Sequence, residues 1–162
     1  MKRTTILWFT VSILVASGVV VLAMSVQKKN TVGVEIYHAG QKYTLPFDQD
    51  AVQDLVRHCE EQLRSADSIL RMAVSDHTVR GLKEKETVIE ISFRKPKTFS
   101  VGFSNQKIEV RRFLIPITGE LAGAVTTIFH GSGSKYASGP LRNSRGTSPI
   151  STIVERLGIL PE

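Results

Sequence analysis

The sequence has few of the residues that carry out chemistry or crosslink a chain. Its 162 residues include one cysteine and four histidines, and aromatic residues make up 7%. A single cysteine excludes a disulfide within the chain. The histidines are scattered and show no H-x-x-x-H spacing: His38, His58, His77 and His130. We therefore predict neither a metal site nor a cofactor, because metal ligands show in a sequence mainly as short repeated spacings.

Motifs for nucleophilic catalysis and for nucleotide binding are also missing. Cys59 adjoins His58, but neighbouring side chains on a helix point about 100° apart and cannot pair as thiolate and base. The glycine-rich stretch 130–139, HGSGSKYASG, lacks the spacing G-x-x-x-x-G-K-[ST] of a phosphate-binding loop. Tyr136 stands where a dinucleotide fingerprint needs its third glycine. We interpret the stretch as a turn, and the protein as one without catalysis.

Charge is unevenly distributed along the chain, whose formal net charge is +6. Acids exceed bases over 48–74, bases exceed acids over 80–112, and no acid occurs between Glu120 and Glu155. A basic face can bind nucleic acid, anionic lipid or an acidic protein. Nucleic acid is the least favoured of these partners, because the chain lacks the interleaved aromatic and basic residues of a single-strand binder.

The longest uncharged run lies at the N-terminus. Residues 4–26 contain no charged side chain and have two cations before them and two shortly after them. As a helix they would extend about 34 Å, which is enough to cross a hydrocarbon core of about 30 Å. We therefore expect a single-pass membrane anchor.

This anchor determines the expected organisation of the chain. We expect a cytoplasmic stub at 1–3, a linker at 27–33 and one globular domain at 34–160. The flanking cations are nearly balanced, and the free N-terminal amine favours a cytoplasmic N-terminus with an extracytoplasmic domain. The alternative is a secreted protein cleaved near Ser25, because Ala23 and Ser25 supply an A-x-S cleavage pattern.

The globular part begins with a predicted β-hairpin and a long helix. Residues 34–47 alternate between apolar and polar side chains around a turn at 39–40. Apolar residues then recur at helical spacing over 51–73. Cys59 lies on the apolar face of this helix, so we expect it in the core.

After a hinge-like stretch at 75–86, the apolar period changes from helical to alternating. The predicted strands are 89–93, 99–103, 108–117 and 121–129, with a short fifth strand near Tyr136. Lys95 and Pro96 are expected to turn the chain between the first two of these strands. A change of parity at 111–112 predicts a β-bulge within the third strand.

The last predicted element is a short helix at 148–157, with Ser148 as cap, Pro149 at its first position and Gly158 as its stop. The fold class is therefore α+β: a hairpin, one long amphipathic helix on an antiparallel meander of four to five strands, and a C-terminal helix. In outline this arrangement resembles the cystatin-like one, in which an antiparallel sheet wraps a helix. The resemblance concerns shape and implies no function.

Our leading functional interpretation is a non-catalytic binding, assembly or regulatory module of the cell envelope, held at the membrane by its N-terminal run. Its partner is expected to be a protein or an anionic ligand. The candidate anion-binding residues are Lys135, Arg142 and Arg145, which lie in the segment without acids before the last helix. The free N–H groups at the N-terminus of that helix would favour an anion nearby.

Two alternatives belong to other classes. One is a hydrolase or transferase whose site is assembled from His130, Ser134 and Glu90. The other is a small lipid or ligand carrier with a cavity between helix and sheet, lined by Phe93, Phe99 and Phe103.

Overall fold

The computed structural model describes residues 32–104 and 106–159. The predicted stub at 1–3 and the predicted anchor at 4–26 lie outside these residues, as does most of the predicted linker. In the described part, no helix has the length and apolar character needed to cross a membrane.

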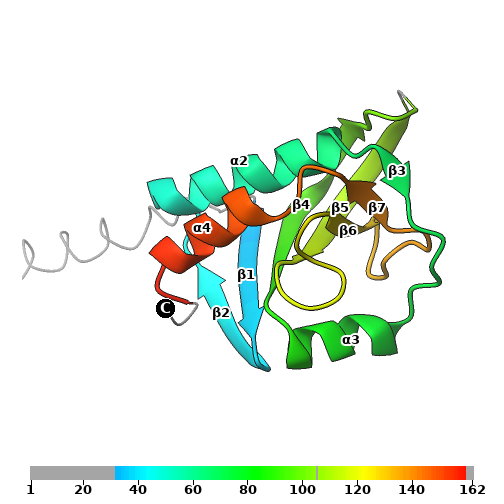
Figure 1. Ribbon diagram of the computed structural model, residues 1–162. Helices are drawn as coiled ribbons and strands as arrows, with labels where there is room; N and C mark the ends of the chain where they lie inside the picture. The colour runs from blue at the N-terminus through cyan, green and yellow to red at the C-terminus, as the bar shows by residue number, and fades with distance from the viewer. Residues whose placement is uncertain (1–31, 105, 160–162) are drawn as a thin grey trace, which may run out of the picture. The chain divides into compact units, whose positions relative to one another are not determined.

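The described residues form an antiparallel sheet of seven strands and three helices, which confirms the α+β class (Figure 1). The strands are β1 (Val32–His38), β2 (Gln41–Leu45), β3 (Ser68–Ile69), β4 (Val88–Ser100), β5 (Lys107–Pro116), β6 (Thr126–Gly131) and β7 (Leu141–Asn143). The helices are α2 (Asp50–Arg64), α3 (Asp76–Lys85) and α4 (Ser148–Arg156). The strand order is β2-β1-β4-β5-β6-β7-β3.

The hairpin of β1 and β2 is confirmed at its predicted turn. Ala39 and Gly40 have φ angles of 48° and 80°. Positive φ at both central residues is the geometry of a type I′ turn, whose twist matches that of the flanking strands. Val34 and Ile36 of β1 are completely buried, whereas most of β2 stays at the exposed edge of the sheet.

Helix α2 ends at Arg64, so the predicted helix over 51–73 was too long. Its apolar face is buried as predicted, and Cys59 lies in the core with no exposure. Beyond the helix, the backbone N–H of Asp67 donates to the carbonyl of Arg142 at 2.8 Å, and β3 pairs with β7. Pairing with a distant strand replaces the next helical turn, and helical periodicity in the sequence cannot reveal such a partner.

Residues 75–86 form helix α3 and its caps, where a hinge was expected. The hydroxyl of Ser75 accepts a hydrogen bond from the backbone N–H of Thr78 at 3.1 Å, which makes Ser75 the N-cap. Lys83 and Lys85 lie in the last turn, where cations interact favourably with the helix dipole. The sequence contains these signals for the two ends of a helix. Few apolar residues lie between them, so the segment shows no clear helical periodicity.

Strand β4 continues through 95–96, where a turn was expected. Residues 93–96 bulge opposite Arg111 alone, while the strand pairs regularly with β5 on both sides of the bulge. The bulge predicted within 108–117 is thus present at that level of the sheet, but its extra residues belong to β4.

The segment after β5 also differs from its prediction. The strand expected over 121–129 begins only at Thr126. The hydroxyl of Thr147 accepts a hydrogen bond from the N–H of Gly123 at 3.2 Å, and this contact holds the residues before Thr126 in a loop. Tyr136 lies outside any strand, and the next strand is β7.

Helix α4 is confirmed with its boundaries shifted slightly. Thr147, rather than Ser148, is the residue that precedes the first turn, and Pro149 lies within that turn. Gly158 follows the helix with a φ of 69°, a conformation that glycine adopts without strain.

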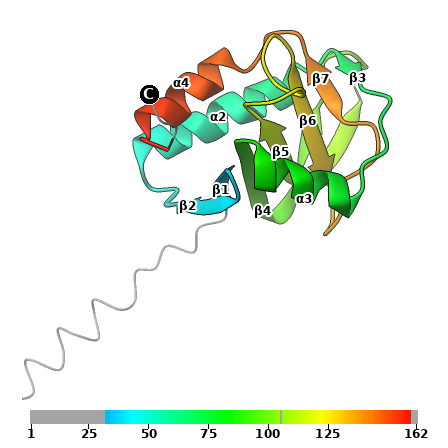
Figure 2. The same cartoon turned by 60° about the horizontal axis from the view of Figure 1, so that its bottom comes forward.

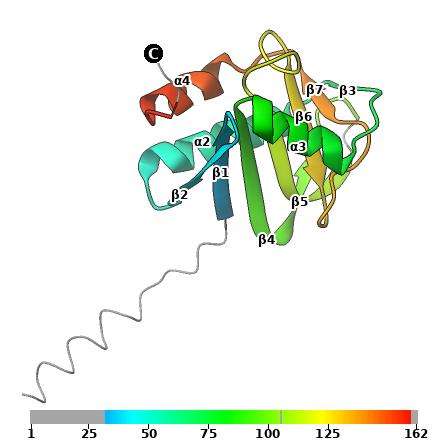
Figure 3. The same ribbon diagram turned by 90° about the horizontal axis from the view of Figure 1, so that it is seen from below.

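The sheet has two unlike faces (Figures 2 and 3). Helices α2 and α4 cover one of them, which we call the apolar face because it holds the large hydrophobic cluster. Helix α3 lies on the other, which we call the polar face. It holds only a small apolar cluster of buried residues, namely Val79, Val88, Leu114 and Phe129. Phe113 and Leu114 are consecutive and belong to opposite faces, as the alternation of a strand requires.

Candidate functional site

The three predicted anion-binding residues lie in different surroundings. Lys135 is exposed and lines a pocket of about 270 Å³ beside the N-terminus of α3, together with Asp76. Arg142 is half-buried in β7. Arg145 is exposed and follows Ser144, whose N–H donates to the carboxylate of Asp67 at 2.8 Å. Carboxylates from other parts of the chain, those of Asp67 and Asp76, therefore lie beside the segment without acids. Joint anion binding by the three residues stays a prediction.

The stretch HGSGSKYASG closes a tight loop after β6. The N–H of Ala137 donates to the carbonyl of His130 at 2.7 Å, and the guanidinium of Arg112 donates to the carbonyl of Ser134 at 3.3 Å. A Cβ atom at Gly131 would lie 2.1 Å from the carbonyl oxygen of Lys135, so only glycine fits there. The glycine is thus explained by close backbone approach within a turn.

His130 and Glu90 do not meet. His130 lies opposite Phe113, on the apolar face, whereas Glu90 lies opposite Leu114, on the polar face. Burial lowers the pKa of His130. A catalytic site that pairs His130 with Glu90 would need both side chains on one face. Among the described residues, no group of three or more histidine, cysteine or acidic side chains could hold a metal ion.

Glu90 is instead the centre of a buried polar cluster that the sequence did not predict. Its side chain is 7% exposed and forms an ion pair with Lys83 of α3. The hydroxyl of Tyr136 donates to the other carboxylate oxygen at 2.5 Å. The hydroxyl of Tyr37 lies 3.5 Å from the oxygen that pairs with Lys83. The guanidinium of Arg112 lies 3.8 Å away.

Several elements meet in this cluster, since its residues come from β1, α3, β4, β5 and the loop before β7. Burial, together with the charge of Glu90, raises the pKa of Tyr136, and burial with the bond to Glu35 raises that of Tyr37. Both hydroxyls therefore stay protonated and remain donors. Both carboxylate oxygens of Glu90 have partners, which suits a group that fastens α3 to the sheet.

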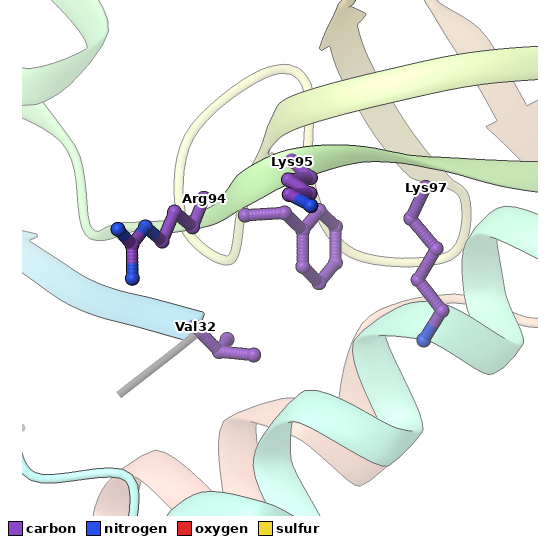
Figure 4. Close-up of a pocket in the computed structure, with 5 residues that line it drawn as sticks. Val32, Arg94, Lys95 and Lys97 are labelled. Carbon is purple, nitrogen blue, oxygen red and sulfur yellow. The ribbon is translucent and has the colours of Figure 1, made fainter. Parts of the chain in front are cut away.

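A second concentration of polar side chains surrounds an open pocket of about 600 Å³, which we call the basic notch. The residues that line it are Val32, Phe93, Arg94, Lys95 and Lys97. Val32, the first residue of β1, pairs with Phe93 of β4. Beyond this pair, β4 continues without a described neighbour on that side. Figure 4 shows the three cations projecting from β4, with Val32 across the opening.

The notch carries an excess of positive charge over an apolar floor. The ammonium of Lys97 lies 2.6 Å from a carboxylate oxygen of Glu60, and Arg64 binds the other oxygen at 2.6 Å. This carboxylate is therefore shared by two cations. Arg94 and Lys95 are exposed, and among the described residues neither forms an ion pair.

The predicted carrier cavity takes a different form. The rings of Phe93 and Phe99 are buried with centroids 6.0 Å apart, and the centroid of Phe113 lies 6.1 Å from that of Phe93. Phe103 is 41% exposed. Of the three phenylalanines expected to line one cavity, Phe93 lines the notch, Phe99 packs in the core and Phe103 faces solvent.

Sequence reasoning missed the notch although its cations were visible. Lys95 and Pro96 interrupt the apolar alternation, so the sequence predicts a turn at these two residues. The pocket forms where the bulged part of β4 extends past the pair of Val32 and Phe93.

The fold and its sites define an α+β domain with a basic surface pocket on one part of the sheet and a buried, internally paired polar cluster on another. No protein-family model, no curated protein and no solved structure matches the chain.

Proposed function

We propose that the protein is a membrane-anchored, extracytoplasmic binding module of the cell envelope, which acts without catalysis and holds an anionic ligand in the basic notch. The observation that carries this proposal is the arrangement of Arg94 and Lys95, two exposed cations with no ion-pair partner among the described residues, beside the apolar floor of Val32 and Phe93.

The chemistry of the notch favours a phosphate or a carboxylate. A guanidinium presents a planar pair of donors that matches either group, and an ammonium adds a compact charge. The apolar floor would shield part of a ligand from water, which strengthens the attraction between opposite charges. The notch also has the size of an ordinary small-molecule site, since such pockets span roughly 300–1,000 Å³.

The proposed location rests on the uncharged run 4–26, which is long enough for a membrane span. Protease added to intact cells or spheroplasts tests it. We expect digestion of the domain together with an exported control protein, and protection of the domain would refute the extracytoplasmic location.

Ligand binding is tested by calorimetric titration of the full chain, in detergent micelles, with inorganic pyrophosphate. Arg94→Ala combined with Lys95→Ala removes the two unpaired cations, and we expect at least a roughly tenfold loss of affinity. The matched control is Arg80→Ala with Lys85→Ala, which removes the same charge from exposed positions on α3.

Equal weakening in the two double variants would contradict a site in the notch and indicate attraction by net charge. Lys135→Ala with Arg142→Ala, in the same titration, tests the anion site predicted from the sequence. A loss confined to that variant would move the site to the loop before β7.

A further inference from the structure

We propose that the ligand of the basic notch is the headgroup phosphate of an anionic phospholipid, in the same membrane that anchors the chain. This inference rests on the proposed function and adds to it the source of the anion. The domain would then bind the membrane surface through two attachments, the N-terminal run and the notch.

Chain length limits how far the notch can lie from the membrane surface. Val32 lines the notch and lies six residues after Val26, the last residue of the uncharged run. Six extended residues reach about 20 Å at most. The headgroup region on each side of a bilayer is roughly 5–8 Å thick. If residues 4–26 span the bilayer, Val32 lies at most about 12–15 Å beyond the headgroup region, and closer if the connecting residues are not fully extended.

The charge of the notch suits this surface. Glu60 pairs with Arg64 and Lys97, whereas Arg94 and Lys95 line the notch without an ion pair among the described residues, so positive charge remains there. Anionic lipids attract basic residues that are held near the membrane. Attraction falls off within a Debye length of about 8 Å in physiological salt, so cations close to the anchor benefit most.

The residues before Val32 carry charge of the same sign as the notch. Residues 27–31, QKKNT, include Lys28 and Lys29 and no acid. Placing these lysines beside Arg94 and Lys95 would bring like charges together. The same lysines would instead add to attraction by an anionic surface.

A partner's β-strand is also a poor occupant. The part of β4 that borders the notch contains Lys95, Pro96 and the bulge. Lysine, proline and bulges are the features that keep the edge of a sheet from pairing with another strand. Proline has no N–H to donate to an added strand. A compact anion can approach the side chains here without needing that ladder.

The apolar floor distinguishes a lipid from a free anion. Val32 and Phe93 line the same pocket as the three cations, so the notch is amphiphilic. A phospholipid presents a phosphate joined to apolar chains through glycerol, whereas a free phosphate has no apolar part. The floor gives the lipid an additional contact that the free ion cannot make.

The test uses the full chain in nanodiscs, with an environment-sensitive fluorophore at Thr98→Cys. Thr98 is exposed and directly follows Lys97 in β4. The natural Cys59 is buried, and burial raises the pKa of its thiol and keeps it unreactive. Quenching by headgroup-labelled lipid is recorded as phosphatidylglycerol replaces phosphatidylcholine. We expect quenching to rise with phosphatidylglycerol.

Arg94→Ala with Lys95→Ala should weaken the apparent affinity for phosphatidylglycerol by about 30-fold. Arg80→Ala with Lys85→Ala is the control and should leave it within about twofold, since these residues lie away from the notch. Quenching that does not depend on phosphatidylglycerol, or that falls equally in both double variants, would overturn the inference.

The pyrophosphate titration separates this inference from the proposed function. Pyrophosphate binding in the notch, with no dependence on lipid charge in nanodiscs, would retain the anion site and refute the lipid as its ligand. Failure of both experiments would refute the anion site as well.

Discussion

The two faces of the sheet bury their side chains by different means. On the apolar face, the fully buried residues such as Leu55, Phe113 and Ile115 exclude water by packing. On the polar face, Glu90 is nearly as buried, but it is held by Lys83 and by tyrosine hydroxyls. The first face depends on filled volume, and the second depends on every charge having a partner.

The largest effect is expected from removing volume on the apolar face. Phe113 is completely buried, and its ring lies 6.1 Å from that of Phe93. Phe113→Ala should lower the free energy of unfolding by about 3–5 kcal/mol, through lost transfer energy and a cavity. Chemical denaturation of the full chain in micelles measures this. Phe103→Ala is the control, and a similar loss there would contradict a core confined to this face.

The next largest effect should come from unpairing charges on the polar face. Glu90→Gln keeps the shape of the side chain but leaves Lys83 and Arg112 without their carboxylate. We expect a loss of about 2–4 kcal/mol in the free energy of unfolding, because partly buried cations lose their compensation.

A matched variant makes the polar comparison sharper. Glu90→Leu with Lys83→Leu removes a carboxylate and an ammonium together, and it should be more stable than Glu90→Gln. If the paired removal is the more damaging change, the polar face is held by packing like the apolar one, and the contrast between the faces is wrong.

The smallest effect is expected at the start of α3, the helix that covers the polar face. Ser75→Ala removes the hydroxyl that accepts from the N–H of Thr78 and should cost about 1 kcal/mol. Hydrogen exchange should show faster exchange in α3, with α2 and α4 unchanged. Ser75→Asp restores a capping acceptor and serves as the control. Faster exchange spread over all three helices would mean that the faces are not independent.

Local elements were largely predictable, because their signals lie within a few residues. The hairpin turn at 39–40, the apolar face around Cys59 and the helix of α4 follow from periodicity, turn residues and caps. The end of α2 was not predictable, since residues after Arg64 bond to β7, far along the chain. Helix α3 could have been predicted from Ser75 and the lysines of its last turn.

The sites were harder to predict than the elements. Glu90 stands between Ile89 and Ile91, and alternation alone places it on the face opposite to theirs. Whether that face is solvent or a buried cluster depends on where α3 and the loop of Tyr136 pack. The notch depends on the registers of β1 and β5 with β4.

By itself, the sequence determined the α+β class, the turn character of HGSGSKYASG and the burial of Cys59, because each follows from spacing between near neighbours. Only the tertiary structure decided that His130 and Glu90 face opposite sides, that Lys135 shares a pocket with Asp76, and that Arg94, Lys95 and Lys97 border a pocket. These outcomes depend on strand register and on which distant segments meet. A one-residue shift in register moves each side chain to the other face, and no local pattern specifies it uniquely.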